Sequence, residues 1–201
     1  MYRLNFIRQR LAEHEPESYA PGPRTRQAAV AVILRTQPAG EEILFIKRAE
    51  KKGDPWSGHM AFPGGHLDPV DADLRAAAER ETLEEIGLSL DGADYLGATD
   101  QHRAMPRGRT LDMIIAPHVF ELSGDPRFTI NYEVDEVVWA PLAPLVRGDF
   151  HDTETKPLGG QPTVFNGYRL ERGHFVWGLT YRMLNSFFST LNPEWQPPPE
   201  L

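Results

Sequence analysis

Residues 62–88 join a glycine turn to an acidic helix, and this stretch limits the possible folds more than any other part of the chain. It reads FPGGHLDPVDADLRAAAERETLEEIGL. Gly87 is a typical C-terminal stop for the predicted helix. Residues three and four positions apart lie on one helix face. The sequence therefore predicts that three carboxylates project as one cluster, namely Glu81, Glu84 and Glu85.

This acidic cluster indicates metal-assisted chemistry on a phosphate. Like charges at helical spacing cost roughly 0.2–0.5 kcal/mol per pair in water. A divalent cation such as Mg²⁺ offsets that cost, because it prefers carboxylate oxygens and often shares its site with substrate phosphates. Gly64 and Gly65 leave the backbone free to approach those phosphates, so Gly64 is a predicted substrate-binding residue.

The same stretch resembles the Nudix box, which is a glycine, five residues, a glutamate, seven residues, then Arg-Glu, an aliphatic residue, any residue, Glu-Glu, any residue, glycine and an aliphatic residue. Residues 80–88 fit the second half, with Thr82 in an aliphatic position. In the first half Asp71 replaces the glutamate, and eight residues separate it from Arg80. This longer spacing is similar to the coenzyme A diphosphatase branch of the family. The resemblance implies an α/β fold, an α/β/α sandwich around a mixed β-sheet.

The resemblance also implies a ligand set for Mg²⁺ or Mn²⁺. Glu81 and Glu85 are the implied metal ligands, with Glu84 beside them. A backbone carbonyl of the glycine turn, assigned here to Gly65, completes the implied set. These three glutamates are also the predicted catalytic residues.

Two further residues are predicted to support catalysis. By resemblance, Arg80 orients the glutamates by pairing with Asp71, or with Asp73 if the longer spacing shifts the register. The alternative for Arg80 is an ordinary helix salt bridge. Glu133 precedes an apolar strand, at a position where some Nudix enzymes carry a further acidic residue, and is the predicted catalytic base; a solvated acidic loop is the alternative.

Segments outside the box also resemble coenzyme A diphosphatases. Arg48 and Gly58 precede Phe-Pro-Gly-Gly at the spacing of the extra motif of that branch, and Arg48 is a predicted substrate contact. The arginine expected between them is replaced by Asp54. Residues 173–180 resemble the Ile-Trp-Gly-Leu-Thr stretch of the family, with core packing as the alternative role.

Three more residues are predicted to bind substrate. His66 follows the glycine turn, whereas His102 and Arg103 lie in a segment, residues 100–109, that is rich in donors suited to phosphate. Solvent exposure is the alternative for each of them.

The pattern of apolar residues indicates one domain over residues 25–192, preceded by a helix and linker (1–24) and followed by a proline-rich tail (193–201). A hairpin over Thr163–Arg172 is expected to turn at Asn166-Gly167. The helices are expected at Ala72–Ile86 and Phe175–Leu191, with a helical turn at Pro141–Val146. The other strands are expected at Gln27–Arg35, Glu42–Arg48, His59–Phe62, Tyr95–Asp100, Thr110–Leu122 and Val134–Ala140.

Composition limits the class of protein and its partners. The 201 residues carry a net charge of −8, which argues against non-specific binding to nucleic acid or membrane. The absence of cysteine excludes disulfides and thiolate catalysis, and cytoplasm is the expected location. The N-terminal helix and the apolar last helix are expected either to form a homodimer contact or to cover the core of a monomer; the apolar residues of the last helix are Phe187, Phe188 and Leu191.

These observations predict metal-dependent hydrolysis of a diphosphate in a nucleoside diphosphate derivative. Coenzyme A or an acyl derivative is the favoured substrate, and an ADP-sugar or dinucleotide diphosphatase is the alternative within the enzyme class. A non-catalytic Nudix-fold ligand sensor and a structural cation-binding domain are the alternatives from other classes.

Overall fold

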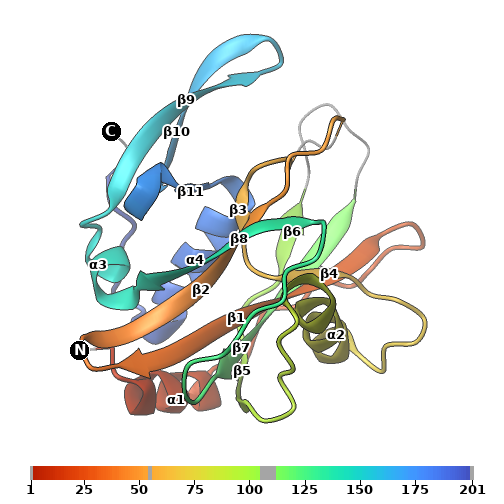
Figure 1. The fold of residues 1–201 in the computed structure, drawn as a ribbon, viewed down its shortest axis with the longest axis vertical. Helices are drawn as coiled ribbons and strands as arrows, with labels where there is room; N and C mark the ends of the chain where they lie inside the picture. The colour runs from red at the N-terminus through yellow and green to blue at the C-terminus, as the bar shows by residue number, and fades with distance from the viewer. Residues whose placement is uncertain (1, 54–55, 105–111, 200–201) are drawn as a thin grey trace.

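A mixed sheet with helices on both faces forms the body of the protein (Figure 1). The computed structural model describes residues 2–53, 56–104 and 112–199. The helices are α1 (Leu4–Glu13), α2 (Leu74–Ile86), α3 (Leu142–Arg147) and α4 (Gly178–Leu191). The strands are β1 (Arg26–Gln37), β2 (Gly40–Arg48), β3 (Met60–Ala61), β4 (Gly64–His66), β5 (Asp94–Ala98), β6 (His102–Ala104), β7 (Met113–Glu121), β8 (Val134–Pro141), β9 (His151–Leu158), β10 (Gln161–Arg169) and β11 (Phe175–Trp177).

The central sheet runs in the order β3-β2-β1-β7-β5, and in addition β4 pairs with β1, β6 with β7 and β8 with β2. β1 and β7 are parallel, while the other pairs are antiparallel, so the mixed sheet predicted from the sequence is confirmed. β1 is long and apolar, and it alternates between the two faces of the sheet. Ala29, Ala31 and Ile33 belong to the apolar cluster that includes α2, whereas Val32 and Leu34 belong to the cluster that includes α1 and α4.

The N-terminal segment packs against the rest of the domain. Leu4, Ile7 and Leu11 of α1 are buried beneath the sheet. The linker after α1 is bound along the β5–β6 connection, where Glu17 N–H donates to Asp100 at 2.9 Å and Tyr19 N–H donates to the Gln101 side chain at 2.8 Å. This linker is therefore an ordered part of the fold.

The predicted position of the turn in the C-terminal hairpin, Asn166-Gly167, was wrong. Asn166 and Gly167 lie inside β10, opposite Thr153 and Asp152 of β9, and the hairpin turns at Gly159-Gly160 instead. A Cβ on Gly167 would lie 2.6 Å from the Phe175 ring, so the glycine is needed where β11 packs against β10. A local turn signal was overridden by this tertiary contact.

The boundaries of two other elements also differ from the prediction. Residues 175–177 form strand β11 rather than the first turn of the last helix, because they pair with residues 167–169 of β10. His102–Ala104, expected in a loop, form strand β6 on the edge of β7. Residues 105–109 of that expected loop lie outside the described ranges, as does Asp54.

The apolar edge of α4 covers the core of this chain, as one of the two alternatives predicted. Phe187, Phe188 and Leu191 are each no more than 1% exposed. Trp195 of the tail packs on Phe188 and donates to the Val146 carbonyl at 2.9 Å. The structure therefore offers no dimer contact through these α4 side chains.

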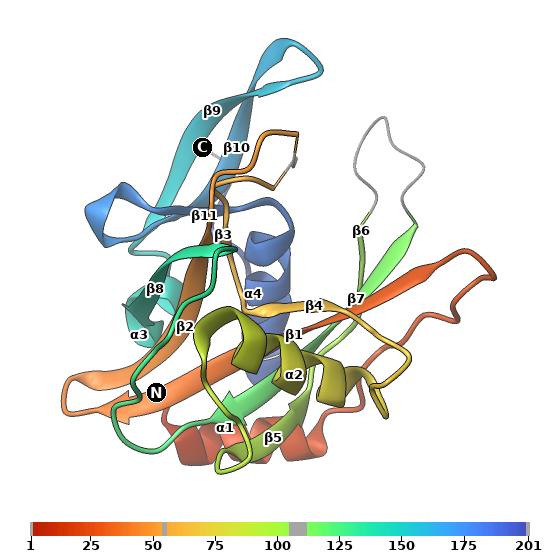
Figure 2. The same ribbon diagram turned by 45° about the vertical axis from the view of Figure 1, so that its right-hand side comes forward.

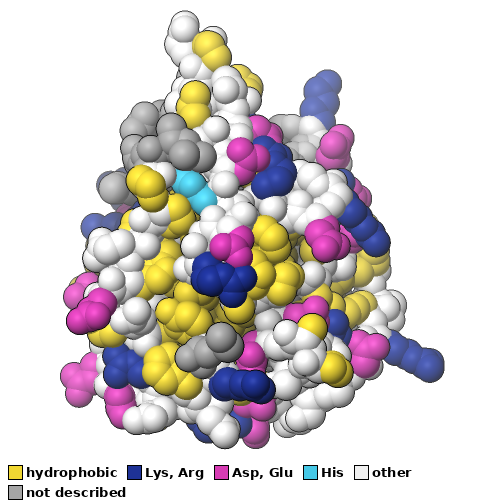
Figure 3. Space-filling model, turned by 90° about the vertical axis from the view of Figure 1, so that its left-hand side faces the viewer, with side chains coloured by type: hydrophobic (Ala, Val, Ile, Leu, Met, Phe, Trp, Pro, Cys, Tyr) yellow, Lys and Arg dark blue, Asp and Glu magenta, His cyan; other side chains and the backbone are white. Residues whose placement is uncertain are grey.

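The side that faces left in Figure 1 carries apolar side chains across its middle, with charged groups among and around them (Figure 3). A second, three-stranded sheet of β9, β10 and β11 stands above the central sheet, with β11 at its base beside β3 (Figures 1 and 2). Of the helices in the described ranges, none is long and apolar enough to span a membrane.

Candidate active site

The glycine turn brings the backbone of β4 against both the sheet and α2. Gly64 pairs with Val30 of β1, and a Cβ on Gly64 would lie 2.2 Å from the Ala29 carbonyl oxygen. Gly64 also has a φ of 151°, which favours glycine. A Cβ on Gly65 would lie 2.4 Å from the Glu81 carboxylate. Gly64 is therefore required for close approach to β1, and Gly65 for close approach to the Glu81 carboxylate.

Glu85 is the most buried acid of α2, at 2% exposure. The Gly64 N–H donates to its Oε2 at 2.9 Å. The pKa of Glu85 is raised to about 7, chiefly by burial; the Gly64 amide and Arg48 oppose the rise, and the charges of Glu81 and Glu133 add to it. A buried carboxylate surrounded by other carboxylates is a strong candidate for a cation ligand.

Glu81 lies one turn earlier on the same face and is 18% exposed at its side chain. Burial raises its pKa, with Arg80 opposing the shift and the charges of Glu84 and Glu133 adding to it. Glu84 differs from its neighbours, because its side chain is 56% exposed and lies at the rim of the group. The structure thus brings the three predicted glutamates to one end of α2 with different degrees of burial.

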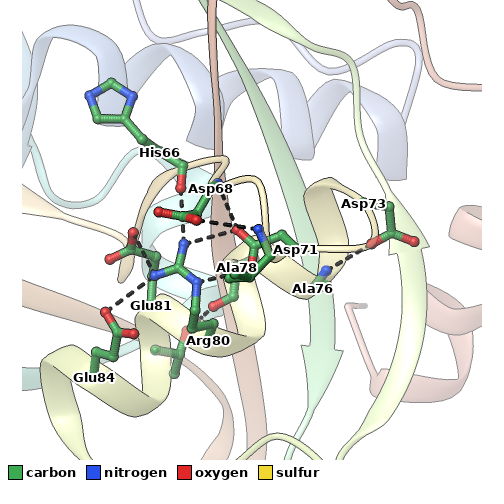
Figure 4. Close-up of polar contacts among 11 residues, drawn as sticks. His66, Asp68, Asp71, Asp73, Ala76, Ala78, Arg80, Glu81 and Glu84 are labelled. Carbon is green, nitrogen blue, oxygen red and sulfur yellow. Dashed lines mark hydrogen bonds and ion pairs between the residues drawn. The ribbon is translucent and has the colours of Figure 1, made fainter.

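Arg80 is held by four neighbours (Figure 4). It pairs with Asp71 through two hydrogen bonds, Nε to Oδ1 at 2.9 Å and Nη2 to Oδ2 at 3.0 Å. It also donates to the His66 carbonyl at 3.0 Å and lies 3.1 Å from Glu81 and 3.2 Å from Glu84. The Arg80 guanidinium is the main reason that the pKa of Asp71 is lowered.

The longer spacing between Asp71 and Arg80 does not change which aspartate pairs with the arginine. Of the two partners left open by the sequence, Asp71 is the one that binds Arg80, and its side chain is 3% exposed. Asp73 instead caps α2 by accepting the Ala76 N–H at 2.8 Å. Thr82 is fully buried in its aliphatic position because its hydroxyl donates to the Ala78 carbonyl at 2.7 Å.

Glu133 approaches the same group from the loop before β8. Its N–H donates to the Asn131 side chain at 2.7 Å, and its carbonyl accepts the Ala49 N–H at 2.8 Å, so the backbone is fixed beside the end of β2. Its charge raises the pKa values of both Glu81 and Glu85. Glu133 therefore adds to the negative charge around the α2 acids.

The other predicted substrate residues lie at different distances from this group. Arg48 ends β2, and its charge acts directly on Glu85. The His66 side chain is exposed and points away from Arg80, so His66 contacts Arg80 through its carbonyl (Figure 4). Arg103 lies 3.4 Å from Asp112 and 5.6 Å from the Tyr19 ring, on the side of the linker.

His102 is not brought together with the carboxylates. It lies opposite Ile115 of β7 on the face covered by α1 and α4, and it is 8% exposed. Burial lowers its pKa to about 4, with Arg182 adding to the shift. The sequence suggested a donor-rich loop here, whereas β6 turns this side chain inward.

Two backbone groups of the site were not predicted from the sequence. The Gly64 amide orients Glu85, and the His66 carbonyl accepts from Arg80. The glycine pair was the only signal for the first, since a side chain would block that approach. The sequence carries no signal for the second, because any residue supplies a carbonyl.

The donor set fits a hard divalent cation. Within the described ranges no three histidine, aspartate or glutamate side chains enclose a cation as they stand. One oxygen of Glu84 accepts from Arg80, and one of Glu85 accepts from the Gly64 amide. Burial is the main cause of the raised pKa values of Glu81 and Glu85, and repulsion from neighbouring carboxylates adds to it; a bound cation relieves that repulsion. Carboxylate oxygens are also the ligands that Mg²⁺ and Mn²⁺ favour.

Comparison with known proteins identifies the family. Residues 25–158 match the model of the NUDIX domain. The chain is 33% identical over 159 residues to a protein of Cronobacter sakazakii described as an uncharacterized Nudix hydrolase, NudL, covering 77% of each. It is 31% identical over 157 residues to the human mitochondrial coenzyme A diphosphatase NUDT8, covering 78% of this chain and 66% of the human protein. It spans only 48% of a third relative, C14C4.10c of Schizosaccharomyces pombe, to which it is 32% identical over 69% of its own length.

A solved structure has the same fold. The crystal structure of a MutT/nudix family protein from Enterococcus faecalis aligns with a TM-score of 0.56 at 17% identity, covering 96% of this chain and 69% of that one. The chain therefore belongs to the Nudix family, and the family and fold predicted from the box are confirmed. It is a Nudix hydrolase, an enzyme of a family that acts on diphosphate linkages and generally uses divalent metal ions.

Proposed function

We propose that this Nudix hydrolase cleaves the diphosphate of coenzyme A or an acyl-coenzyme A, with Mg²⁺ or Mn²⁺ as cofactor. The observation that carries the hydrolytic chemistry is the placement of Glu81 and Glu85 against the backbone of Gly64 and Gly65. The choice of coenzyme A is supported by similarity to the human coenzyme A diphosphatase over 78% of the chain. We place the enzyme in the cytoplasm as part of the same proposal.

In this mechanism Glu81, Glu84 and Glu85, together with the carbonyl of Gly65, would hold the metal. A bound divalent ion neutralises charge on the diphosphate and activates water. The Gly64 amide fixes the Glu85 carboxylate, and Arg80 aligns Glu81 while its own position is set by Asp71. In the structure one oxygen of Glu84, Oε2, accepts from Arg80 at 3.2 Å.

The remaining residues act on substrate and water. Arg48 is a cation close to Glu85, and it binds the diphosphate oxygens as charge develops on them. Glu133 accepts a proton from the attacking water, whose oxygen bonds to phosphorus as the bridging P–O bond breaks. Coenzyme A and one water then give 3′,5′-ADP and 4′-phosphopantetheine.

One sequence observation favours a second substrate class. Asp54 stands where the coenzyme A motif has an arginine, which removes a positive charge from that loop. An ADP-sugar or dinucleotide substrate would not need it. A ligand sensor and a structural cation-binding domain both predict the absence of turnover.

A hydrolysis panel tests these possibilities. The purified protein is assayed with Mg²⁺ or Mn²⁺ on coenzyme A, an acyl-coenzyme A, ADP-ribose, NADH and diadenosine polyphosphates. Glu85→Gln is the inactive variant, and Glu79→Gln is the matched control because Glu79 pairs with Arg75 on the same helix. The proposal is supported if the wild type and Glu79→Gln release 3′,5′-ADP and Glu85→Gln does not. If only another substrate is cleaved, coenzyme A is not the substrate. If no substrate is cleaved, the proposed hydrolytic reaction is rejected.

A further inference from the structure

Three aromatic rings from separate parts of the chain meet at the base of the β9–β10 hairpin. The Trp177 ring lies 4.7 Å from the His59 ring and 4.7 Å from the Phe165 ring, with interplanar angles of 62° and 58°. All three side chains are partly exposed, and Phe165 and Trp177 lie outside both apolar clusters of the domain. We refer to His59, Phe165 and Trp177 as the ring cluster.

Charged side chains form ion pairs beside the ring cluster on one face of the hairpin. Arg169 pairs with Asp152 at 2.9 Å and with Glu154 at 2.6 Å. Lys156 pairs with Glu154, and its Nζ lies 5.1 Å from the centre of the Trp177 ring. The antiparallel register places Phe165 opposite Glu154, so the rings and these ion pairs lie on the same face of the hairpin.

The ring cluster is connected to the carboxylate group by a short backbone path. The carbonyl of His59 accepts the Arg48 N–H at 3.0 Å, and the charge of Arg48 acts on Glu85. Five residues lead from His59 to Gly64, whose amide binds Glu85. A segment of that length spans at most about 18 Å when fully extended. This reach is comparable to that of an extended nucleoside diphosphate.

The chemistry of this surface suits a planar, uncharged ring better than a phosphate. The charges of these paired side chains cancel, because two are acidic and two are basic, so they create no net attraction for an anion. They are Asp152, Glu154, Lys156 and Arg169. Partly exposed aromatic rings stack on nucleobases regardless of base identity, because every base has a π-face. An ammonium group above an aromatic ring adds a donor at the edge of such a stack.

We infer that the ring cluster binds the nucleobase of the substrate, the adenine of coenzyme A if the proposed function holds. The diphosphate then extends along β3 toward Arg48 and the carboxylates of α2. This inference rests on the proposed function and assigns Trp177 and its neighbours as specificity-determining residues.

The test separates substrate binding from turnover. Trp177→Ala is expected to raise the KM for coenzyme A about tenfold and to leave kcat within about twofold, whereas Trp177→Phe keeps most of the affinity. Phe165→Ala gives a second measurement if Trp177→Ala does not fold. The matched control is Val164→Ala, because Val164 is 57% exposed and faces the other side of β10.

Two inhibitors identify the part of the substrate that is bound. The inhibition constant of 3′,5′-ADP is expected to rise about tenfold in Trp177→Ala, while that of 4′-phosphopantetheine, which lacks a base, stays unchanged. A shift for 4′-phosphopantetheine alone, or wild-type constants in both ring variants, overturns the inference.

The inference remains testable even if the proposed function fails. ADP is then titrated into the wild type and Trp177→Ala by calorimetry. Weaker binding of ADP to the variant supports a nucleobase site, whereas equal affinity or no binding to either protein refutes it.

Discussion

The two sides of the central sheet are packed differently. On the side of α2 the contact includes four small residues, Ala29, Ala31, Ala77 and Ala78, beside larger ones such as Ile33 and Phe120. On the side of α1 and α4 it is made by large ones, including Phe45, Phe187 and Phe188. Small residues let a helix approach a sheet closely, and here they leave Glu85 within hydrogen-bond reach of the Gly64 amide. Large residues bury more apolar area, which favours stability.

This difference suggests a division of roles. The α2 side keeps carboxylates partly buried, at a cost in free energy that a bound cation offsets. Burial of apolar side chains on the α4 side stabilises the fold and offsets this cost. Substitutions on the two sides should therefore affect different measurements.

The largest expected effect is on catalysis from the α2 side. Glu85→Gln removes the negative charge beside Gly64 while keeping the shape of the side chain. We expect turnover to fall by about 1,000-fold or more, as for the loss of a central group in an active site. Steady-state kinetics gives the value, and Glu79→Gln should retain wild-type turnover. Equal rates for Glu85→Gln and the wild type would remove Glu85 from the mechanism.

The next effect is on stability from the α4 side. Phe188 is fully buried against Tyr168 and Trp195. Phe188→Ala should lower the free energy of unfolding by about 3–5 kcal/mol because it leaves a cavity. Urea denaturation measures this, with Phe6→Ala as control because Phe6 is 37% exposed. Turnover per folded molecule should stay at the wild-type value, and a catalytic loss as large as the Glu85→Gln loss would contradict the division of roles.

A smaller effect distinguishes the two aspartates before α2. Asp71→Asn takes the charged partner from Arg80 and should lower turnover about 10- to 100-fold, as for loss of a group that orients metal ligands. Asp73→Asn keeps a capping side chain at the start of α2, so it should change neither turnover nor stability by much. If the two variants have the same kinetics, Arg80 does not depend on Asp71 for its role.

The box explains why so much of the α2 side could be predicted. Glycine turn, helix, acids and terminal glycine are all local in sequence, and helical spacing converts their order directly into a shared face. The Asp71–Arg80 pair could be proposed for the same reason, although only the structure chose between Asp71 and Asp73.

The C-terminal hairpin could not be predicted in the same way. Asn166-Gly167 is a good local turn signal, but pairing with β9 and contact with Phe175 place it inside a strand. His102 was assigned to a loop because the sequence does not show that β6 pairs with β7. Both errors arise from pairing between neighbouring strands, which lies outside the few residues that a local turn or loop signal covers.

The smallest expected effect is a pH dependence shared by both sides of the sheet. His102 lies on the α4 side, and His118, on the α2 side, is hydrogen-bonded to Tyr95. Burial lowers the pKa of each histidine to about 4. The folded state therefore binds fewer protons than the unfolded chain, so stability present above pH 6.5 is lost as pH falls toward 4.

Thermal unfolding at pH 7.5 and pH 5 measures this loss. Each histidine should contribute roughly 1–2 kcal/mol at pH 5 relative to pH 7.5. His118→Gln and His102→Gln should each reduce the difference between the two pH values. His66→Gln is the control, because His66 is exposed. An unchanged difference in both buried-site variants would show that other groups control acid unfolding.

The most direct test of the account is calorimetric titration of Mn²⁺ into the wild type, Glu85→Gln and Glu79→Gln. The account predicts binding to the wild type and to Glu79→Gln, and loss of most of that binding in Glu85→Gln. Equal binding by all three proteins would contradict it, because the cation would then be held somewhere other than the buried carboxylates beside the glycine turn.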